Sequence, residues 1–328
     1  MGVFHFLNVG QGDCSIIQHA SGNVTVVDVN HAKPPLSETS SLIMQVLKEN
    51  YHQKDSPTNP IEYMLDHGIK SVFRFVLSHP DMDHMGGIKA FFEQFSPANF
   101  WDTANTCRKD DWSNSPYNRE DWDFYCGLRS GANTKTKRLV LHSNDRGKFY
   151  NIDGSDNAGG DGLYILSPTP KLVSDANGCE DFNDCSYVIL YKSSAGRILL
   201  AGDSHDKTWE HVLKYHAADI ANVEVLLAPH HGRHSDRDFG FLDVVRPALT
   251  LFGNAASTHL AYREWSRRGL PIITNNQAGD VIIDTNGANM QVYVSNSAYA
   301  AKINPGGSWD ANYRGYWVGE IAAAERVA

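Results

Sequence analysis

Four separate stretches of this sequence share one design, in which a short hydrophobic run leads directly into side chains that can bind a metal ion. The longest is FVLSHPDMDHMGG, residues 75–87, which places two histidines and two aspartates within six positions. The others are VTVVD, RILLAGD and VLLAPHH, which end at Asp28, at Asp203 and at the pair His230 and His231. Such runs predict buried strands, and functional side chains converge at the strand ends of α/β sheets. The pattern therefore predicts a layered α/β domain with one composite polar site.

Each stretch also has an ordinary structural explanation when it is taken alone. A single aspartate after a strand is usually a turn residue or a helix cap, and HPDMDH could be a cap-rich loop between a strand and a helix. The pair in HHG could equally lie on the surface. Four such stretches together are hard to explain as caps, and histidine with carboxylate is a donor set that suits Zn²⁺ or Mn²⁺. The combination therefore favours a metal site.

The composition limits the class of protein. The chain has 328 residues, of which 41% are hydrophobic and 20% charged, and this length fits one large domain or two fused halves. Its net charge of −9 argues against a surface that binds nucleic acid everywhere, although a local basic groove remains compatible with it. Five cysteines without a CxxC pair are expected to be free thiols in a reducing compartment. Without a signal-peptide pattern or a run of about 20 apolar residues, we expect a cytoplasmic protein with no membrane partner.

The quoted stretches resemble the metallo-β-lactamase superfamily, and in particular the hydrolase domain of the DNA-uptake competence protein ComEC. The matching pieces follow the family order over most of residues 3–260: FLNVGQGDCSII, VTVVDVN, LSHPDMDHMGG, NDCSYVILYKSSAGRILLAGD, LLAPHHG and LFGNAASTH. The resemblance implies an α/β fold of the αββα sandwich type, with two mixed sheets and helices outside. We expect a single hydrolase domain over residues 1–296, with an insert at about 100–162 and a C-terminal extension at 297–328.

The same resemblance implies a set of metal ligands and supporting residues. His79 and Asp81 would bind one cation, Asp83 and His84 the second, and Asp203 would bridge the two. Either His230 or His231 would complete the shell, and His230 is the preferred choice. Asp83 and Asp203 are the expected catalytic carboxylates, and the expected cofactor is a pair of Zn²⁺ ions, with Mn²⁺ as the alternative. The expected supporting residues are Asp28 behind the ligands, and Asn183 and Ser186 where many relatives have a further histidine.

The function implied by the resemblance is phosphodiester hydrolysis by a hydroxide bound to a dinuclear metal centre. We therefore expect a phosphodiesterase or nuclease, with nucleic acid or another phosphodiester as substrate and no predicted protein partner. The insert over residues 100–150 is expected to form one wall of the substrate groove. Lys135, Lys137 and Arg138 in its basic part would hold flanking phosphates.

Other interpretations remain open at this point. The basic run could be a solvated face, and the aromatic residues near it could fill a core. One alternative function is hydrolysis of a small ester, a lactone or a phosphocholine-type substrate. Aromatic residues could enclose the quaternary ammonium group of the last of these. The other alternative is a non-catalytic binding module that kept the fold.

Overall fold

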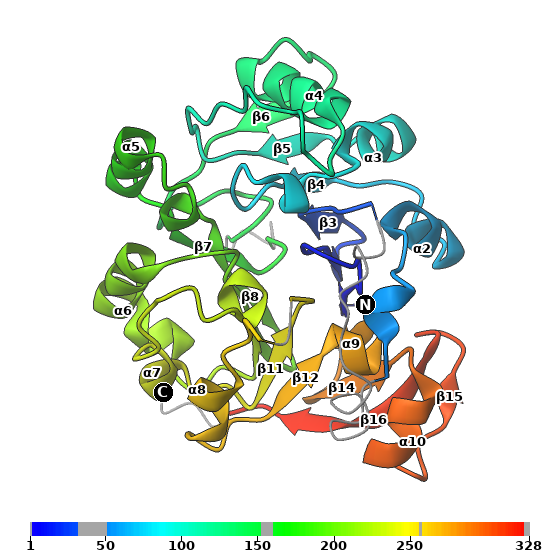
Figure 1. Cartoon of the computed structure of the whole chain (residues 1–328). Coiled ribbons are helices and arrows are strands. Elements are labelled where there is room, and N and C mark those ends of the chain that lie inside the picture. Colours follow the sequence, from blue (N-terminus) through cyan, green and yellow to red (C-terminus); the bar gives the residue numbers. More distant parts are fainter. Residues whose placement is uncertain (1, 32–50, 152–159, 256–257, 325–328) are drawn as a thin grey trace.

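Two mixed β-sheets organise the chain, and each combines a parallel part with an antiparallel part (Figure 1). The computed structural model describes residues 2–31, 51–151, 160–255 and 258–324. The larger sheet has ten strands in the order β15-β16-β14-β13-β1-β2-β3-β4-β5-β6, and the smaller has six in the order β12-β11-β10-β9-β8-β7.

The bounds of the elements are as follows. The larger sheet contains β1 (Val3–Phe6), β2 (Ser15–Gln18), β3 (Val24–Val27), β4 (Arg74–Val76), β5 (Asn99–Trp101), β6 (Lys137–Leu139), β13 (Val281–Asp284), β14 (Asn289–Val294), β15 (Trp309–Asp310) and β16 (Gly315–Ala322). The smaller sheet contains β7 (Leu163–Ser167), β8 (Val188–Ser193), β9 (Gly196–Leu200), β10 (Val225–Leu227), β11 (Leu249–Phe252) and β12 (Ile272–Thr274). The α-helices are α2 (Pro60–Asp66), α3 (Ile88–Phe95), α4 (Arg119–Ser130), α5 (Pro170–Cys179), α6 (Asp206–Ile220), α7 (Leu242–Val245), α8 (Tyr262–Ser266), α9 (Asn275–Ala278) and α10 (Ser297–Ile303). Short 3₁₀ helices are η1 (Gln53–Asp55), η2 (Met82–His84), η3 (Asn183–Cys185) and η4 (Pro229–Gly232).

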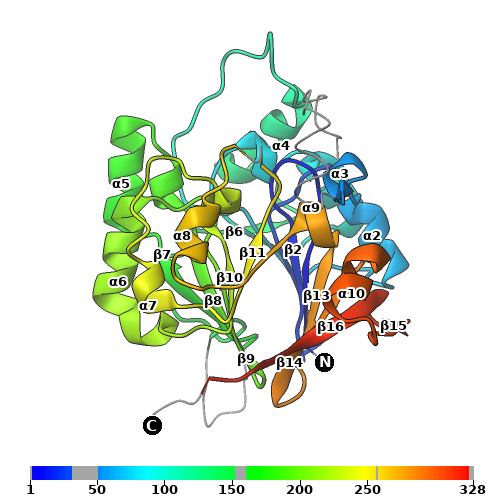
Figure 2. The same ribbon diagram turned by 60° about the horizontal axis from the view of Figure 1, so that its bottom comes forward.

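The two sheets pack face to face. Phe4 and Val76 of the larger sheet belong to the same buried cluster as Ile198 and Val225 of the smaller one. Side chains of α2, α3 and α4 cover the outer face of the larger sheet, and those of α6, α7 and α8 cover the outer face of the smaller sheet. Figure 2 shows the strands lying between these two groups of helices. The predicted αββα sandwich is confirmed.

The hydrophobic runs in the sequence follow from this burial on both faces. In β9, Ile198 and Leu200 enter the core between the sheets, whereas Leu199 faces the helices. Successive side chains of a strand point to opposite faces, so a strand covered on both sides is apolar at every position. ILL in β9 and VLL in β10 are therefore sequences of inner strands, and the candidate ligands come after them.

Parallel pairing brings these strand ends together. In the larger sheet β3 pairs in parallel with β4, and in the smaller sheet β9 pairs in parallel with β10. Parallel neighbours share the edge at which they end, so the residues after β3 and β4 gather at one edge of their sheet, and those after β9 and β10 gather at one edge of theirs. The candidate ligands follow these four strands.

The segments predicted as insert and extension both contribute to the larger sheet. Within 100–162 lie α4, which packs beside α3, and the edge strand β6, while residues 152–159 lie outside the described part of the chain. The segment 297–328 supplies α10, β15 and β16, and β16 pairs antiparallel with β14. The division into a domain at 1–296 and an extension stays a prediction. Among the described residues, no helix is both long enough and apolar enough to cross a membrane.

Candidate metal centre

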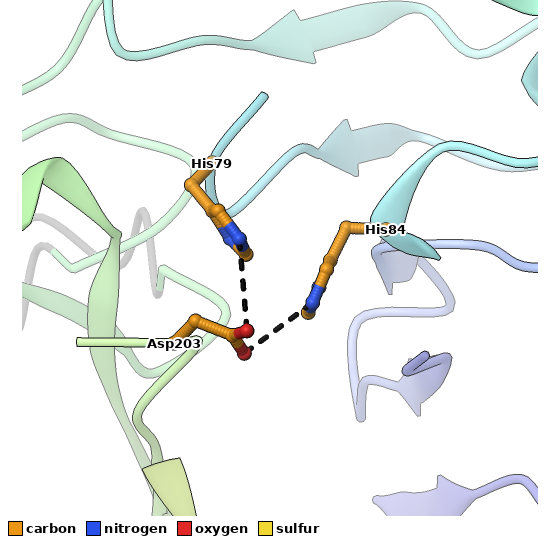
Figure 3. A group of neighbouring side chains, drawn as sticks. All are labelled: His79, His84 and Asp203. Carbon is orange, nitrogen blue, oxygen red and sulfur yellow. Dashed lines mark ion pairs between the residues drawn. The ribbon is translucent and has the colours of Figure 1, made fainter. Parts of the chain in front are cut away.

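Histidines from the larger sheet and an aspartate from the smaller sheet form the middle of the candidate site. His79 follows β4 and His84 ends η2, while Asp203 follows β9. His84 Nε2 lies 3.3 Å from Asp203 Oδ1, and His79 Nε2 lies 3.7 Å from Asp203 Oδ2. Figure 3 shows both imidazoles pointing toward the Asp203 carboxylate. All three side chains are buried.

Asp83 and His231 extend the centre beside His84 and Asp203. His231 Nε2 lies 3.3 Å from Asp83 Oδ2 and 3.7 Å from Asp203 Oδ2. Three overlapping triads each bring their ligand atoms within 4.8 Å of one another: His79, His84 and Asp203; Asp83, His84 and His231; and Asp13, Asp203 and His231. Asp203 therefore joins the triad that contains His79 to the triad that contains Asp13.

Three of the histidines are held from behind, at the nitrogen that faces away from the centre. His84 Nδ1 lies 2.9 Å from Asp28 Oδ2, and His231 Nδ1 lies 3.0 Å from Asp13 Oδ1. A carboxylate only accepts hydrogen bonds, so each ring carries a hydrogen on Nδ1, and a cation bound in the centre would take the lone pair of Nε2. His79 Nδ1 has the Ser78 hydroxyl at 3.0 Å. Metal-binding histidines are oriented in this way by carboxylates and other oxygen acceptors.

Buried polar atoms without a hydrogen-bond partner test whether these residues fit a metal ion. His79 Nε2, His84 Nε2 and Asp203 Oδ1 are such atoms. Their separations of 3.3–3.7 Å are those of ion pairs without hydrogen-bond geometry. A buried polar atom left without a partner costs about 1–3 kcal/mol. A cation between them would satisfy all three, and imidazole with carboxylate suits Zn²⁺ or Mn²⁺.

The electrostatics of the site also favour a cation. Burial alone lowers the pKa of His84, but the carboxylates of Asp203, Asp28 and Asp83 together raise that pKa well above its usual value. Burial alone raises the pKa of Asp203, but His231, His84 and His79 together bring it well below its usual value. The buried carboxylates therefore attract positive charge strongly, and a divalent ion would supply it in place of protons on the histidines.

His230 also approaches the centre, but its surroundings differ from those of His231. His230 Nε2 lies 3.5 Å from Asp203 Oδ2, while its Nδ1 lies 3.0 Å from an Arg237 nitrogen and 3.0 Å from the Ser235 hydroxyl. Burial, the largest influence, lowers the pKa of His230 to about 3. Both histidines have left-handed backbone angles, and Gly232 follows because a Cβ there would lie 2.3 Å from the Phe252 ring. The left-handed turn in HHG thus directs two adjacent rings to the same carboxylate.

The remaining predicted ligand and supporting residues lie at or beyond the edge of the centre. The Asp81 side chain is 48% exposed and approaches His79 Nε2 at 3.6 Å. Asn183 lies 3.4 Å from His205 Nε2 rather than from any member of the triads. The Ser186 hydroxyl is buried without a hydrogen-bond partner. The structure thus gathers His79, Asp83, His84, Asp203 and both histidines of HHG closely, with Asp81 at the edge.

The basic residues predicted to hold phosphates have other surroundings. Arg138 donates two hydrogen bonds to the buried carboxylate of Asp102, so its charge is used within the fold. Lys135 and Lys137 are exposed. The role of these three side chains in substrate binding stays a prediction.

A cleft of about 760 Å³ opens beside the centre at Asp81. The rest of its lining comes from the loop at Met82, from the predicted insert and from the region of α5: Pro80, Met82, Thr106, Cys107, Arg108, Lys109, Asp110, Trp122, Asn177, Glu180 and Phe182. The insert therefore contributes a wall of this cleft. The cationic side chains in that wall are Arg108 and Lys109.

Asp13 and Arg237 are the residues of the site that were missed in the sequence. Asp13 belongs to GQGD, where the glycines offered a signal. Gly12 has φ +96°, and a Cβ there would lie 1.9 Å from the Asp83 carbonyl oxygen, so the turn approaches the metal loop closely. Arg237 follows HHG in a stretch rich in charged residues and gave no signal.

Comparison with known proteins gives matches to solved structures alone. No family model matches the chain, and no curated protein matches it significantly. A metallo hydrolase from the hyperthermophilic archaeon Ignicoccus hospitalis has a TM-score of 0.46 at 13% identity, over 86% of this chain and 99% of that one. The metallo-beta-lactamase fold protein YhfI from Bacillus subtilis has a TM-score of 0.44 at 9% identity, over 84% of this chain and 96% of that one. An isothiocyanate hydrolase from Delia radicum gut bacteria has a TM-score of 0.43 at 13% identity, over 84% of this chain and 95% of that one.

These TM-scores lie below 0.5, so the sheet order and the side-chain distances, rather than these similarities, define the fold and the site. The resemblance to ComEC stays a prediction. The chain is an αββα sandwich with a candidate metal centre of histidines and aspartates between the strand ends of its two sheets.

Proposed function

We propose that this protein is a metal-dependent hydrolase. The observation that carries the proposal is the Asp203 carboxylate, which four imidazoles approach at 3.3–3.7 Å while its Oδ1 and the Nε2 atoms of His79 and His84 lack hydrogen-bond partners. A divalent ion bound there would supply Lewis-acid activation of water near neutral pH. Asp83 and Asp203 would hold the positive charge, and His79, His84 and His231 would offer their Nε2 atoms.

The number of ligand groups supports two ions. A tetrahedral zinc site takes about four ligands, whereas the three triads contain five side chains besides Asp13, which holds His231 from behind. Asp203 belongs to two of the triads and has two carboxylate oxygens, so two adjacent ions could share it. Two Zn²⁺ ions are the proposed cofactor, and Mn²⁺ is the alternative.

The proposed substrate is a phosphodiester. Arg108 and Lys109 in the cleft beside Asp81 offer positive charge for a phosphate, and Trp122 and Phe182 offer aromatic surface for a base or another flat group. The acidic side chains of Asp81, Asp110 and Glu180 line the same cleft. This mixture favours a short phosphodiester or the end of a strand over a long polyanion, whose binding requires a continuous basic surface.

Two measurements test this proposal. The metal content of the protein, purified gently and then loaded with zinc or manganese, should approach two equivalents. The loaded protein should then hydrolyse a member of a panel of bis(p-nitrophenyl) phosphate, cyclic dinucleotides, single-stranded DNA, duplex DNA and RNA. If a lactone or a carboxylic ester is hydrolysed while every phosphodiester stays intact, the alternative hydrolase replaces the phosphodiesterase. If the protein takes up no metal, it is a binding module that kept the fold.

A further inference from the structure

The two histidines of HHG face the same carboxylate but have opposite surroundings at their other nitrogen. His231 Nδ1 faces the carboxylate of Asp13, which accepts hydrogen bonds. His230 Nδ1 faces the guanidinium of Arg237, which lies 3.0 Å away and carries donors alone. Nδ1 of His231 therefore donates a hydrogen bond, whereas Nδ1 of His230 accepts one.

Arg237 is placed firmly enough to impose this difference. It is buried, and its other terminal nitrogen donates to the Ser204 carbonyl oxygen at 2.7 Å. Its remaining terminal nitrogen is thereby directed at His230 Nδ1, which must accept the hydrogen bond. In the neutral imidazole one nitrogen donates and the other accepts, so the hydrogen of His230 is on Nε2.

This arrangement makes His230 unsuitable as a metal ligand through Nε2. A neutral imidazole that binds a cation through Nε2 carries its hydrogen on Nδ1, where it would point at an N–H of Arg237. His84 and His231 have carboxylates at that place and avoid the conflict. His230 is also the more accessible of the pair, since its side chain is 18% exposed whereas that of His231 is 3% exposed.

We infer that His230 is a hydrogen-bond donor to the substrate at the metal centre and that Arg237 is the positioning residue that holds it in this form. The inference rests on the proposed hydrolase function and adds a named contact to it. The recipient would be an oxygen that gains negative charge during attack, such as a phosphoryl oxygen. A fixed donor of this kind contributes about 10²–10³-fold to kcat in enzymes that use one.

The first test separates a donor from a ligand by metal content. We compare His230→Ala, His230→Asn and His231→Ala after equal zinc loading, with His234→Ala as the matched control, because the His234 side chain is 58% exposed and lies in the same segment. The His230 variants and the control should retain the zinc content of the unaltered protein, whereas His231→Ala should lose zinc. Loss of zinc from His230→Ala and His230→Asn to the same extent as from His231→Ala would overturn the inference.

The second test is independent of catalysis. Spectra of the zinc-loaded protein labelled with ¹⁵N-histidine should show the hydrogen of His230 on Nε2, with the signals assigned by their absence in His230→Asn. Zinc bound at His230 Nε2 would contradict the inference even if no substrate had been found. Failure of the proposed function would look different, because the unaltered protein would then bind no zinc at all.

Kinetics test the role of Arg237. With the small phosphodiester bis(p-nitrophenyl) phosphate, His230→Ala and Arg237→Met should lower kcat by about 10²-fold or more with little change in KM. Arg237→Lys keeps a donor and should restore part of kcat. Equal loss in Arg237→Lys and Arg237→Met, or full kcat in His230→Ala, would show that the pair has a structural role alone.

Discussion

The carboxylate of Asp28 lies 2.9 Å from His84 Nδ1, although the two residues are 56 positions apart. Its other oxygen accepts a hydrogen bond from the Ser78 N–H at 2.7 Å. One side chain therefore fixes both the strand end that carries the metal loop and the orientation of a ligand in that loop. Asp28 has φ 60°, a left-handed conformation that asparagine also adopts readily.

Asp28→Asn should therefore weaken metal binding without disturbing the backbone. The amide oxygen can still accept from Ser78, but the amide nitrogen would then face His84 Nδ1 and force the ring hydrogen onto Nε2. Loss of such a partner typically lowers metal affinity by about 10–100-fold. Competition with a chromogenic zinc chelator measures the affinity, and an unchanged dissociation constant would show that Asp28 does not orient His84.

Asp203→Ala should remove metal and activity together while most of the fold remains. Its carboxylate is the group that four imidazoles approach, so no other side chain can replace it. The matched control is Asp81→Ala, since Asp81 is half-exposed and approaches His79 alone among the ligands. We expect Asp81→Ala to retain more metal than Asp203→Ala, as measured by elemental analysis. Normal metal content in Asp203→Ala would disprove its bridging role.

Gly12→Ala should destabilise the protein more than Gly22→Ala. Both glycines have positive φ, at +96° and +88°, so both substitutions carry a similar cost of about 1–2 kcal/mol for the left-handed backbone. They differ in space, because a Cβ at Gly12 would meet the Asp83 carbonyl oxygen at 1.9 Å, whereas nothing lies within 4 Å of one at Gly22. The clash should add about 1–3 kcal/mol for Gly12→Ala. Urea unfolding of both variants measures this difference, and equal destabilisation would contradict the close approach.

Arg138→Ala should lower stability, whereas Lys135→Ala should not. Arg138 pairs with Asp102, a buried carboxylate that Tyr125 and Asn105 also contact. Removing one partner of a buried pair costs about 3–5 kcal/mol, and the partial exposure of Arg138 reduces this to about 2–3 kcal/mol. Lys135 is exposed, and its replacement should change the free energy of unfolding by less than about 0.5 kcal/mol. Chemical denaturation of the two variants decides between a structural role for Arg138 and the predicted contact with phosphate.

Asp280 should make stability fall as the pH rises through weakly acidic values. Burial raises its pKa from 3.8 to about 6, against the opposing hydrogen bonds from the Asn8 N–H and the Thr58 hydroxyl. Between these two pKa values the folded protein keeps a proton that the unfolded chain has released. The stabilisation from this group is therefore complete below pH 3.8, falls as the pH approaches 6 and is absent above it.

Asp280→Asn should abolish this dependence. A shift of about 2 pKa units corresponds to about 3 kcal/mol at most. The free energy of unfolding of Asp280→Asn, minus that of the unaltered protein, should therefore increase by about 2–3 kcal/mol from pH 4 to pH 7. Urea titrations in the presence of a chelator give this difference without the metal site. A difference that stays constant over this range would show that Asp280 is already ionised at pH 4.

The sequence was informative where function and burial gave local patterns. Continuous apolar runs predicted buried strands, and the polar residues after them predicted which side chains gather at the candidate centre. Both predictions depend only on residues that are neighbours in the sequence. Asp13 could not be assigned in this way, because its hydrogen bond to His231 joins residues 218 positions apart.

The remaining gaps have similar causes. The choice between His230 and His231 depends on a left-handed turn and on Arg237, neither of which the spacing of HHG reveals. The basic run drew attention to Arg138, but its charge is neutralised by Asp102 from a segment 36 positions earlier. The strand in the C-terminal extension gave no local signal, since β16 is defined by its pairing with β14 rather than by its own pattern.

The division of the ligands between the two sheets has a mechanical consequence. The larger sheet carries His79, Asp83 and His84, and the smaller sheet carries Asp203 and His231. A cation bound by both groups would therefore cross-link the two sheets. By mass action, an ion present at 100 times its dissociation constant adds about 2.7 kcal/mol to the free energy of unfolding. The supply of metal would then set the fraction of chains that are folded as well as the rate of turnover. Scarcity of the ion would lower both.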